Sequence, residues 1–160
     1  MRSSVLKAVF LSALLVVAGS AWGEVHEVQV RNMGSNGQPM VFEPALVQMA
    51  PGDTVRFVWK DMGHNASSYH PDNRGKPDLV PAGAKAWDSG FKQPGGTFEV
   101  TMEKEGVHHY FCLPHESMGM VGMVVVGDAS KGPGLDAVKK ADIPPQAKAK
   151  FRKLHGQLED

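Results

Sequence analysis

The side chains most capable of chemistry lie close together in the last third of the chain. Cys112 is the only cysteine, His115 follows it by three positions, and Met120 stands five positions further on. This spacing places a thiolate, an imidazole and a thioether in one short turn. A soft thiolate combined with imidazoles and a long, weak thioether bond is the ligand set of an electron-transfer copper site. The motif therefore predicts such a site, which needs one more imidazole from elsewhere in the fold.

The second imidazole is expected from His64. It lies in the segment Asp61-Met62-Gly63-His64-Asn65, directly after an alternating apolar run that predicts a strand. The thioether has two candidates, because Met118 and Met120 are only two positions apart. Spacing does not separate them, and either would be chemically sensible as an axial ligand.

Cys112 has three other chemically reasonable interpretations. It could be a small buried hydrophobic residue, a nucleophile with His115 as its base, or one ligand of a zinc site. A lone thiol in an exported chain needs a reason, no nucleophile signature surrounds it, and structural zinc sites favour more cysteines. Three of the remaining histidines are interpreted as structural or exposed: His70, His108 and His109. The other two, His26 and His155, carry no functional signal.

The first residues have the pattern of a secretory signal peptide. Arg2 and Lys7 precede an apolar run at 8–18, and small residues follow at Ala21 and Gly23. The run is shorter than the roughly 20 apolar residues that a membrane anchor needs. We therefore predict a signal peptide at 1–23, with cleavage after Ala21 or Gly23, and export to the periplasm. The whole chain has 17 basic and 17 acidic residues, which argues against nucleic-acid binding.

The segment 24–127 is expected to form one all-β domain. Short runs rich in valine and aromatic residues alternate with turn residues, as in a sandwich or barrel. Strands are predicted at 25–30, 54–59, 97–102, 108–111 and 122–126, with kinked or edge strands on either side of Pro44. The proline-rich stretch 67–96 is a long loop, and Trp87 and Phe91 are expected to pin it to the core.

The segment 128–160 has a different character. A linker at 131–134 leads to a short helix at 135–141, and Pro144-Pro145 opens a longer one. This helix has apolar residues at helical spacing, and the stripe is expected to pack on the β-domain rather than on a membrane or a partner. The stripe comprises Ala147, Phe151, Leu154 and Leu158.

These motifs together resemble the pseudoazurins, within the plastocyanin-like branch of the cupredoxins. The resemblance covers essentially all of the chain after residue 23. It is carried by Met40-Val41-Phe42-Glu43-Pro44-Ala45, Pro51-Gly52-Asp53-Thr54-Val55, Gly63-His64-Asn65, Cys112-Leu113-Pro114-His115 and Met118-Gly119-Met120.

The resemblance implies an eight-stranded Greek-key sandwich with one type 1 copper ion at one end. It implies His64, Cys112, His115 and Met120 as ligands, Asn65 as a link between the two ligand loops, and electron passage through the exposed edge of His115. Leu113 stands where the family has a hydroxyl residue, so a side-chain link from this position to Asn65 is not expected. The implied function is a soluble, monomeric periplasmic electron carrier rather than an enzyme, serving c-type cytochromes or nitrite reductase. A copper-binding or copper-delivery protein is the alternative.

Overall fold

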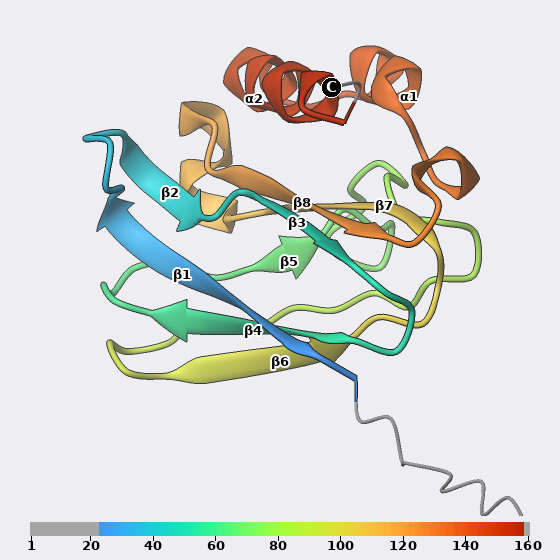
Figure 1. Ribbon diagram of the computed structural model, residues 1–160. Coiled ribbons are helices and arrows are strands. Elements are labelled where there is room, and N and C mark those ends of the chain that lie inside the picture. Colours follow the sequence, from blue (N-terminus) through green and yellow to red (C-terminus); the bar gives the residue numbers. More distant parts are fainter. Residues whose placement is uncertain (1–22, 159–160) are drawn as a thin grey trace, which may run out of the picture.

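The computed structural model describes residues 23–158 and arranges them as two sheets with helices on one side (Figure 1). The predicted signal peptide falls almost wholly on residues 1–22, which lie outside the described part, so it stays a prediction. The first sheet has the order β2-β1-β4-β6, and the second has the order β3-β8-β7-β5. The predicted all-β sandwich is confirmed.

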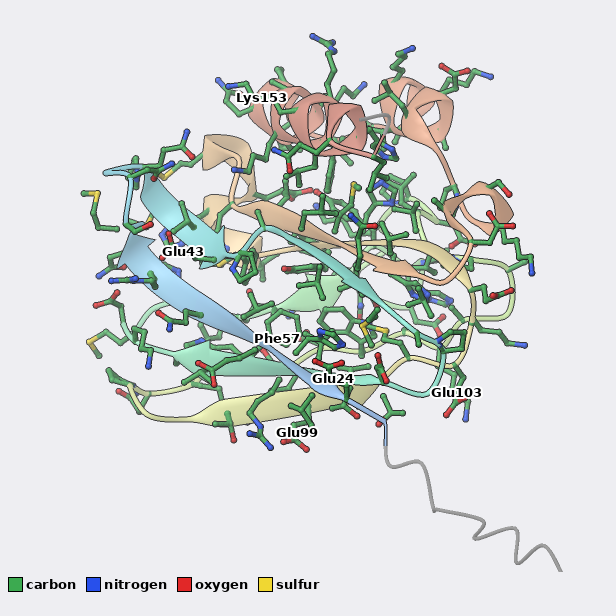
Figure 2. The ribbon with its side chains drawn as sticks, viewed as in Figure 1. Glu24, Glu43, Phe57, Glu99, Glu103 and Lys153 are labelled. Carbon is green, nitrogen blue, oxygen red and sulfur yellow. The ribbon has the colours of Figure 1, made fainter. Side chains whose placement is uncertain are left out.

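The first sheet is built from β1 (Val25–Met33), β2 (Pro39–Glu43), β4 (Thr54–Trp59) and β6 (Thr97–Thr101). Strand β1 pairs with β4 in parallel, while β2 and β6 pair antiparallel with β1 and β4. The side chains of β4 alternate as predicted, with Val55, Phe57 and Trp59 fully buried (Phe57 is labelled in Figure 2). Strand β1 runs three residues beyond the predicted end, which brings Asn32 to the end of the sandwich where β4 also ends.

The second sheet is built from β3 (Leu46–Met49), β5 (Ser67–Ser68), β7 (Gly106–Phe111) and β8 (Val121–Val126). Pro44 lies where the chain leaves β2, an edge strand of one sheet, and enters β3, an edge strand of the other. Every residue of β7 and β8 is buried, because these central strands have the first sheet on one face and helices on the other. This two-sided burial explains why 122–126 is almost entirely apolar.

The helices cover the outer face of the second sheet (Figure 1). After the short η2 (Ala129–Lys131), the chain forms α1 (Leu135–Lys140) and α2 (Pro145–Gly156). Ala147 and Phe151 are fully buried and Leu154 nearly so, and all three belong to a cluster with β7 and β8. The prediction that the apolar stripe packs on the sandwich is confirmed.

The long loop between β5 and β6 is fixed to the core by Trp87 but not by Phe91. The ring of Trp87 lies 5.4 Å from that of Phe57 and 5.7 Å from that of Tyr110. Phe91 is 60% exposed, so its predicted anchoring role is wrong. The loop turns away from the core at Gly90, whose φ is +62°, and Phe91 follows on the outside.

Candidate metal centre

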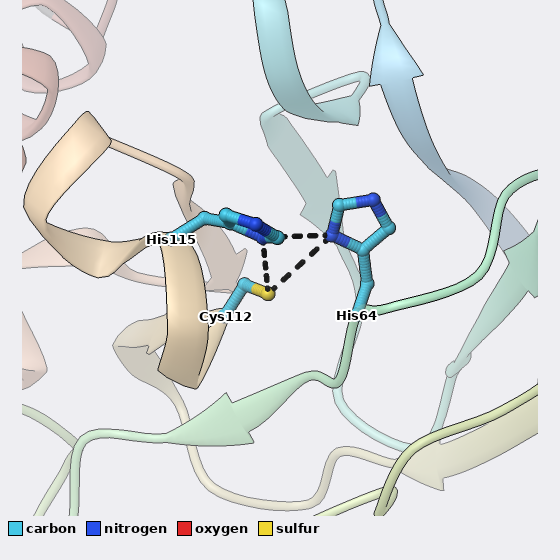
Figure 3. Close-up of side chains that lie close together, drawn as sticks. All are labelled: His64, Cys112 and His115. Carbon is cyan, nitrogen blue, oxygen red and sulfur yellow. Dashed lines mark hydrogen bonds between the residues drawn. The ribbon is translucent and has the colours of Figure 1, made fainter.

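Three donor atoms converge at the end of the sandwich (Figure 3). The two Nδ1 atoms of His64 and His115 lie 3.1 Å apart, and the Cys112 Sγ lies 3.7 Å from the first and 3.6 Å from the second. Cys112 and His64 are fully buried, whereas His115 is partly exposed. The structure therefore brings together the three residues that the sequence pattern selected, from two segments about fifty positions apart.

A short hydrogen-bonded turn positions Cys112 and His115. Cys112 directly follows β7, and the 3₁₀ helix η1 (Leu113–Met118) then carries His115 back toward it before β8 begins. The His115 N–H donates to the Cys112 carbonyl at 3.2 Å, and the Met120 N–H donates to the His115 carbonyl at 3.1 Å. Gly119, with φ of +84°, ends the helix in the left-handed conformation that favours glycine. The turn is thus closed by its own backbone.

Met120 is the better placed of the two methionines. It is fully buried and belongs to the same apolar cluster as Cys112. Its carbonyl accepts the Cys112 N–H at 3.0 Å, so its backbone is fixed beside the thiol. Met118 is 51% exposed and faces a groove beside α2. The burial of Met120 supports it as the thioether of the site.

His64 is oriented by a contact that the sequence did not reveal. Its Nε2 lies 2.8 Å from the side-chain oxygen of Asn32, so Nε2–H donates and Nδ1 keeps its lone pair toward Cys112. The Trp59 indole N–H also donates to the His64 carbonyl at 2.9 Å. Burial, followed by the neighbouring His115, lowers the pKa of His64, which keeps the ring neutral and able to bind a metal.

Asn65 joins the two segments that supply the donors. Its side-chain oxygen accepts the Leu113 N–H at 2.7 Å, and its amide donates to the Ser67 hydroxyl at 2.8 Å. The expected link between the loops is therefore confirmed. It uses the backbone of Leu113, so the absence of a hydroxyl at that position does not remove it.

The donor set fits a copper ion. Metal bonds of about 2.0 Å to nitrogen and 2.3 Å to sulfur place three ligand atoms in a plane roughly 3.5–3.8 Å apart. The separations of 3.6 and 3.7 Å agree with this range, and the 3.1 Å between the nitrogens is slightly shorter. Burial raises the pKa of the Cys112 thiol to about 11, while the backbone N–H groups of Asn65 and His115 lower it. Cys112 binds a metal in its thiolate form, so metal binding must displace the thiol proton.

The other histidines lie away from this centre. His108 Nε2 lies 2.7 Å from the Lys104 carbonyl, and His109 is buried between the Leu79 carbonyl at 2.8 Å and His155 Nε2 at 2.9 Å. The structural interpretation of His108 and His109 is confirmed, but the pairing of His155 was missed. Burial is the main cause that lowers the pKa of His109 to about 3.

A second group of potential ligands is explained without an ion. Donor atoms of Glu24, His26 and Asp53 lie within 4.8 Å of one another. The Asp53 carboxylate accepts the backbone N–H groups of Glu24 at 2.8 Å and Ala50 at 3.0 Å, and His26 Nε2 lies 3.1 Å from it. These contacts fasten the start of β1 to the turn before β4.

Within residues 23–158, no helix has both the length and the apolar character needed to cross a bilayer. The single group of cysteine and histidine donors in that part of the chain is the one at Cys112.

Known proteins match this chain over most of its length. Residues 28–127 match the family model of copper binding proteins of the plastocyanin/azurin family. The pseudoazurin of Paracoccus pantotrophus is 36% identical over 140 residues, which cover 88% of each chain. The pseudoazurin of Methylorubrum extorquens is 34% identical over 158 residues, covering 99% of this chain and 97% of the relative.

Solved structures agree with the sequence comparison. A pseudoazurin from Sinorhizobium superposes with a TM-score of 0.71 at 37% identity, covering 86% of this chain and 98% of the other. The predicted cupredoxin fold is thus confirmed, including the helices after the last strand. The chain belongs to the plastocyanin/azurin family of copper-binding, electron-transfer proteins and, within that family, to the pseudoazurins.

Proposed function

We propose that this protein carries single electrons in the periplasm, using one copper ion held by His64, Cys112, His115 and Met120. The observation that carries the proposal is the convergence of one sulfur and two imidazole nitrogens, 3.1–3.7 Å apart. Cys112 and His115 come from a turn closed by its own hydrogen bonds, and His64 comes from a separate segment. Bound copper supplies one-electron Cu(II)/Cu(I) chemistry. The buried thiol and His64 hold the ion inside the sandwich, and His115 gives it a partly exposed edge.

Electrons would enter and leave at His115. Among the four proposed ligands it alone has an accessible side chain, and exposed Pro114 and Met118 flank it. Such a surface fits brief docking with c-type cytochromes or nitrite reductase, the partners that the family resemblance implies. Stopped-flow reduction by these candidates at several salt concentrations tests the partner proposal, because charge-steered docking slows as salt rises.

The processing of the chain is part of the proposal. A signal peptide at 1–23 is removed, the copper domain spans 24–127, and the linker and helices of 128–160 cover its second sheet. Mass spectrometry of the protein recovered from a periplasmic extract is expected to give an N-terminus at Glu24 or Trp22. An intact Met1 in the recovered protein would contradict export by cleavage.

The ligand proposal is tested by loading the mature protein with Cu(II) and recording its visible spectrum. The parent is expected to show an intense thiolate-to-copper band that Cys112→Ser abolishes. Met120→Leu is expected to shift the band and the reduction potential, whereas its matched control Met118→Leu leaves both unchanged. A parent that lacks the band but holds Cu(I) and releases it readily would indicate copper delivery instead.

A further inference from the structure

A buried carboxylate lies directly beside the proposed ligand His115. Glu116 is only 6% exposed, and its side chain points toward the long loop that follows β5. The Tyr69 hydroxyl donates to Glu116 Oε1 at 2.7 Å, and the Lys76 ammonium pairs with Oε2. Burial, and then the hydrogen bond to Glu116, raise the pKa of Tyr69 well above its ordinary value, so the phenol stays a donor. Both oxygens of this carboxylate are therefore held by the long loop.

Tyr69 and Lys76 also contact Phe111, on the other side of Cys112 and His115. The ring of Tyr69 lies 4.6 Å from that of Phe111, and the Lys76 nitrogen lies 4.8 Å from the centre of the Phe111 ring. Phe111 immediately precedes Cys112, and Glu116 immediately follows His115. The stretch from Cys112 to His115, which carries two of the proposed ligands, is thus contacted on both sides by Tyr69 and Lys76.

The loop is itself well supported at this point. The Tyr69 N–H donates to the His109 carbonyl at 3.0 Å, and the Leu79 N–H donates to the Tyr69 carbonyl at 3.0 Å. The Asn73 amide donates to the carbonyls of Ser68 at 2.8 Å and Trp87 at 3.0 Å. Tyr69 and Lys76 therefore project from backbone that β7 and the rest of the loop hold in place.

The chemistry of these contacts suits positioning better than stabilisation. A buried ion pair costs desolvation energy, and well-packed apolar residues of similar volume usually give equal or greater stability. An ion pair and a directed hydrogen bond do, however, specify one arrangement of the turn.

We propose that Tyr69, Lys76 and Glu116 are positioning residues of the copper site, and we name them the loop tether. The tether holds His115 close to Cys112 and His64, and it places a balanced pair of charges beside a residue that would bind the copper ion. This gives the long loop a function, and it rests on the proposed electron-carrier function.

The test uses the copper-loaded protein with Glu116→Gln, Lys76→Met and Tyr69→Phe. Glu99→Gln is the matched control, since Glu99 pairs with Arg56 at 2.6 Å on the exposed face of the first sheet. Three quantities are measured: the copper hyperfine splitting in the EPR spectrum, the reduction potential and the electron self-exchange rate.

Opposite shifts are expected from the two charge variants. Glu116→Gln retains an oxygen for Tyr69 but removes a negative charge, so the potential rises. Lys76→Met leaves the carboxylate uncompensated, so the potential falls. Tyr69→Phe keeps both charges but loosens the turn, so the hyperfine splitting changes and self-exchange slows, while Glu99→Gln behaves as the parent.

Two outcomes would overturn the tether. Shifts of the same sign in Glu116→Gln and Lys76→Met would show a general packing effect, and parental values in all three variants would show that the tether does not act on the metal. In both cases the parent keeps its intense visible band, so the electron-carrier proposal survives. Absence of that band in the parent itself would contradict both the electron-carrier proposal and the tether proposal.

Discussion

Asn65→Ala is expected to destabilise the metal-free protein strongly, because one side chain joins the two segments that supply the metal donors. Asn65 is 1% exposed, accepts the Leu113 N–H at 2.7 Å and donates to the Ser67 hydroxyl at 2.8 Å. Alanine cannot make either bond. The Leu113 N–H and the Ser67 oxygen then lose their partner at a place that bulk water barely reaches.

The expected cost follows from these two contacts. Leaving a buried donor unsatisfied costs about 1–3 kcal/mol, and losing a second hydrogen bond adds about 1 kcal/mol. The free energy of unfolding should therefore fall by roughly 2–4 kcal/mol, a large part of the 5–15 kcal/mol that is typical of a domain. Copper should also be released faster, since the segments of His64 and Cys112 are no longer tied.

Asn36→Ala provides a matched control. Asn36 likewise accepts a backbone N–H, from Gln38 at 3.1 Å, but at an exposed position where water replaces the lost acceptor. This variant should change stability by less than about 0.5 kcal/mol. Urea unfolding of the metal-free parent and both variants gives the comparison. A difference of less than 1 kcal/mol between the two variants would refute the assigned role of Asn65.

Three further predictions concern His109, α2 and Asn32. Because the pKa of His109 is lowered to about 3, only the unfolded chain takes up this proton between pH 6.5 and pH 3, so stability should fall as the pH drops through this window. The loss should reach about 3 kcal/mol at pH 4 relative to pH 7 in urea titrations, and His109→Gln should flatten the dependence. Phe151→Ala removes a fully buried ring and should cost about 3–5 kcal/mol, whereas Phe91→Ala, at a ring 60% exposed, should leave the thermal midpoint nearly unchanged. Asn32→Ala removes the acceptor for His64 Nε2 and should weaken Cu(II) affinity about 10–100-fold in competition titrations; a parental affinity would show that this contact does not orient His64.

The sequence predicted those parts of the fold and site that depend on local pattern. The alternation of Val55, Phe57 and Trp59 indicates a strand with one buried face, and the structure buries all three. Cys112 and His115 can be selected together because one turn contains both, and the residues of a turn are close together in the sequence. His64 could be predicted for a similar reason, because it lies shortly after a segment with a clear strand pattern.

The contacts that the sequence did not reveal all join segments distant along the chain. Asn32 reaches His64 only because β1 pairs in parallel with β4 and extends three residues beyond its predicted end. Tyr69 and Glu116 are 47 positions apart, and neither residue type indicates in the sequence that it will pair with the other. Contacts of this kind depend on how the strands and loops assemble, so no local sequence pattern predicts them.

The arrangement of the donors also bears on whether the protein carries electrons or delivers copper. Handing a metal to another protein requires ligands that an incoming group can replace one after another. Cys112 and His64 are fully buried here, and only His115 offers an open edge. The turn is closed by its own backbone, and Asn32 and Trp59 hold His64 from the other side. Ligands fixed before the metal arrives move little when its charge changes, which favours repeated electron transfer and opposes release.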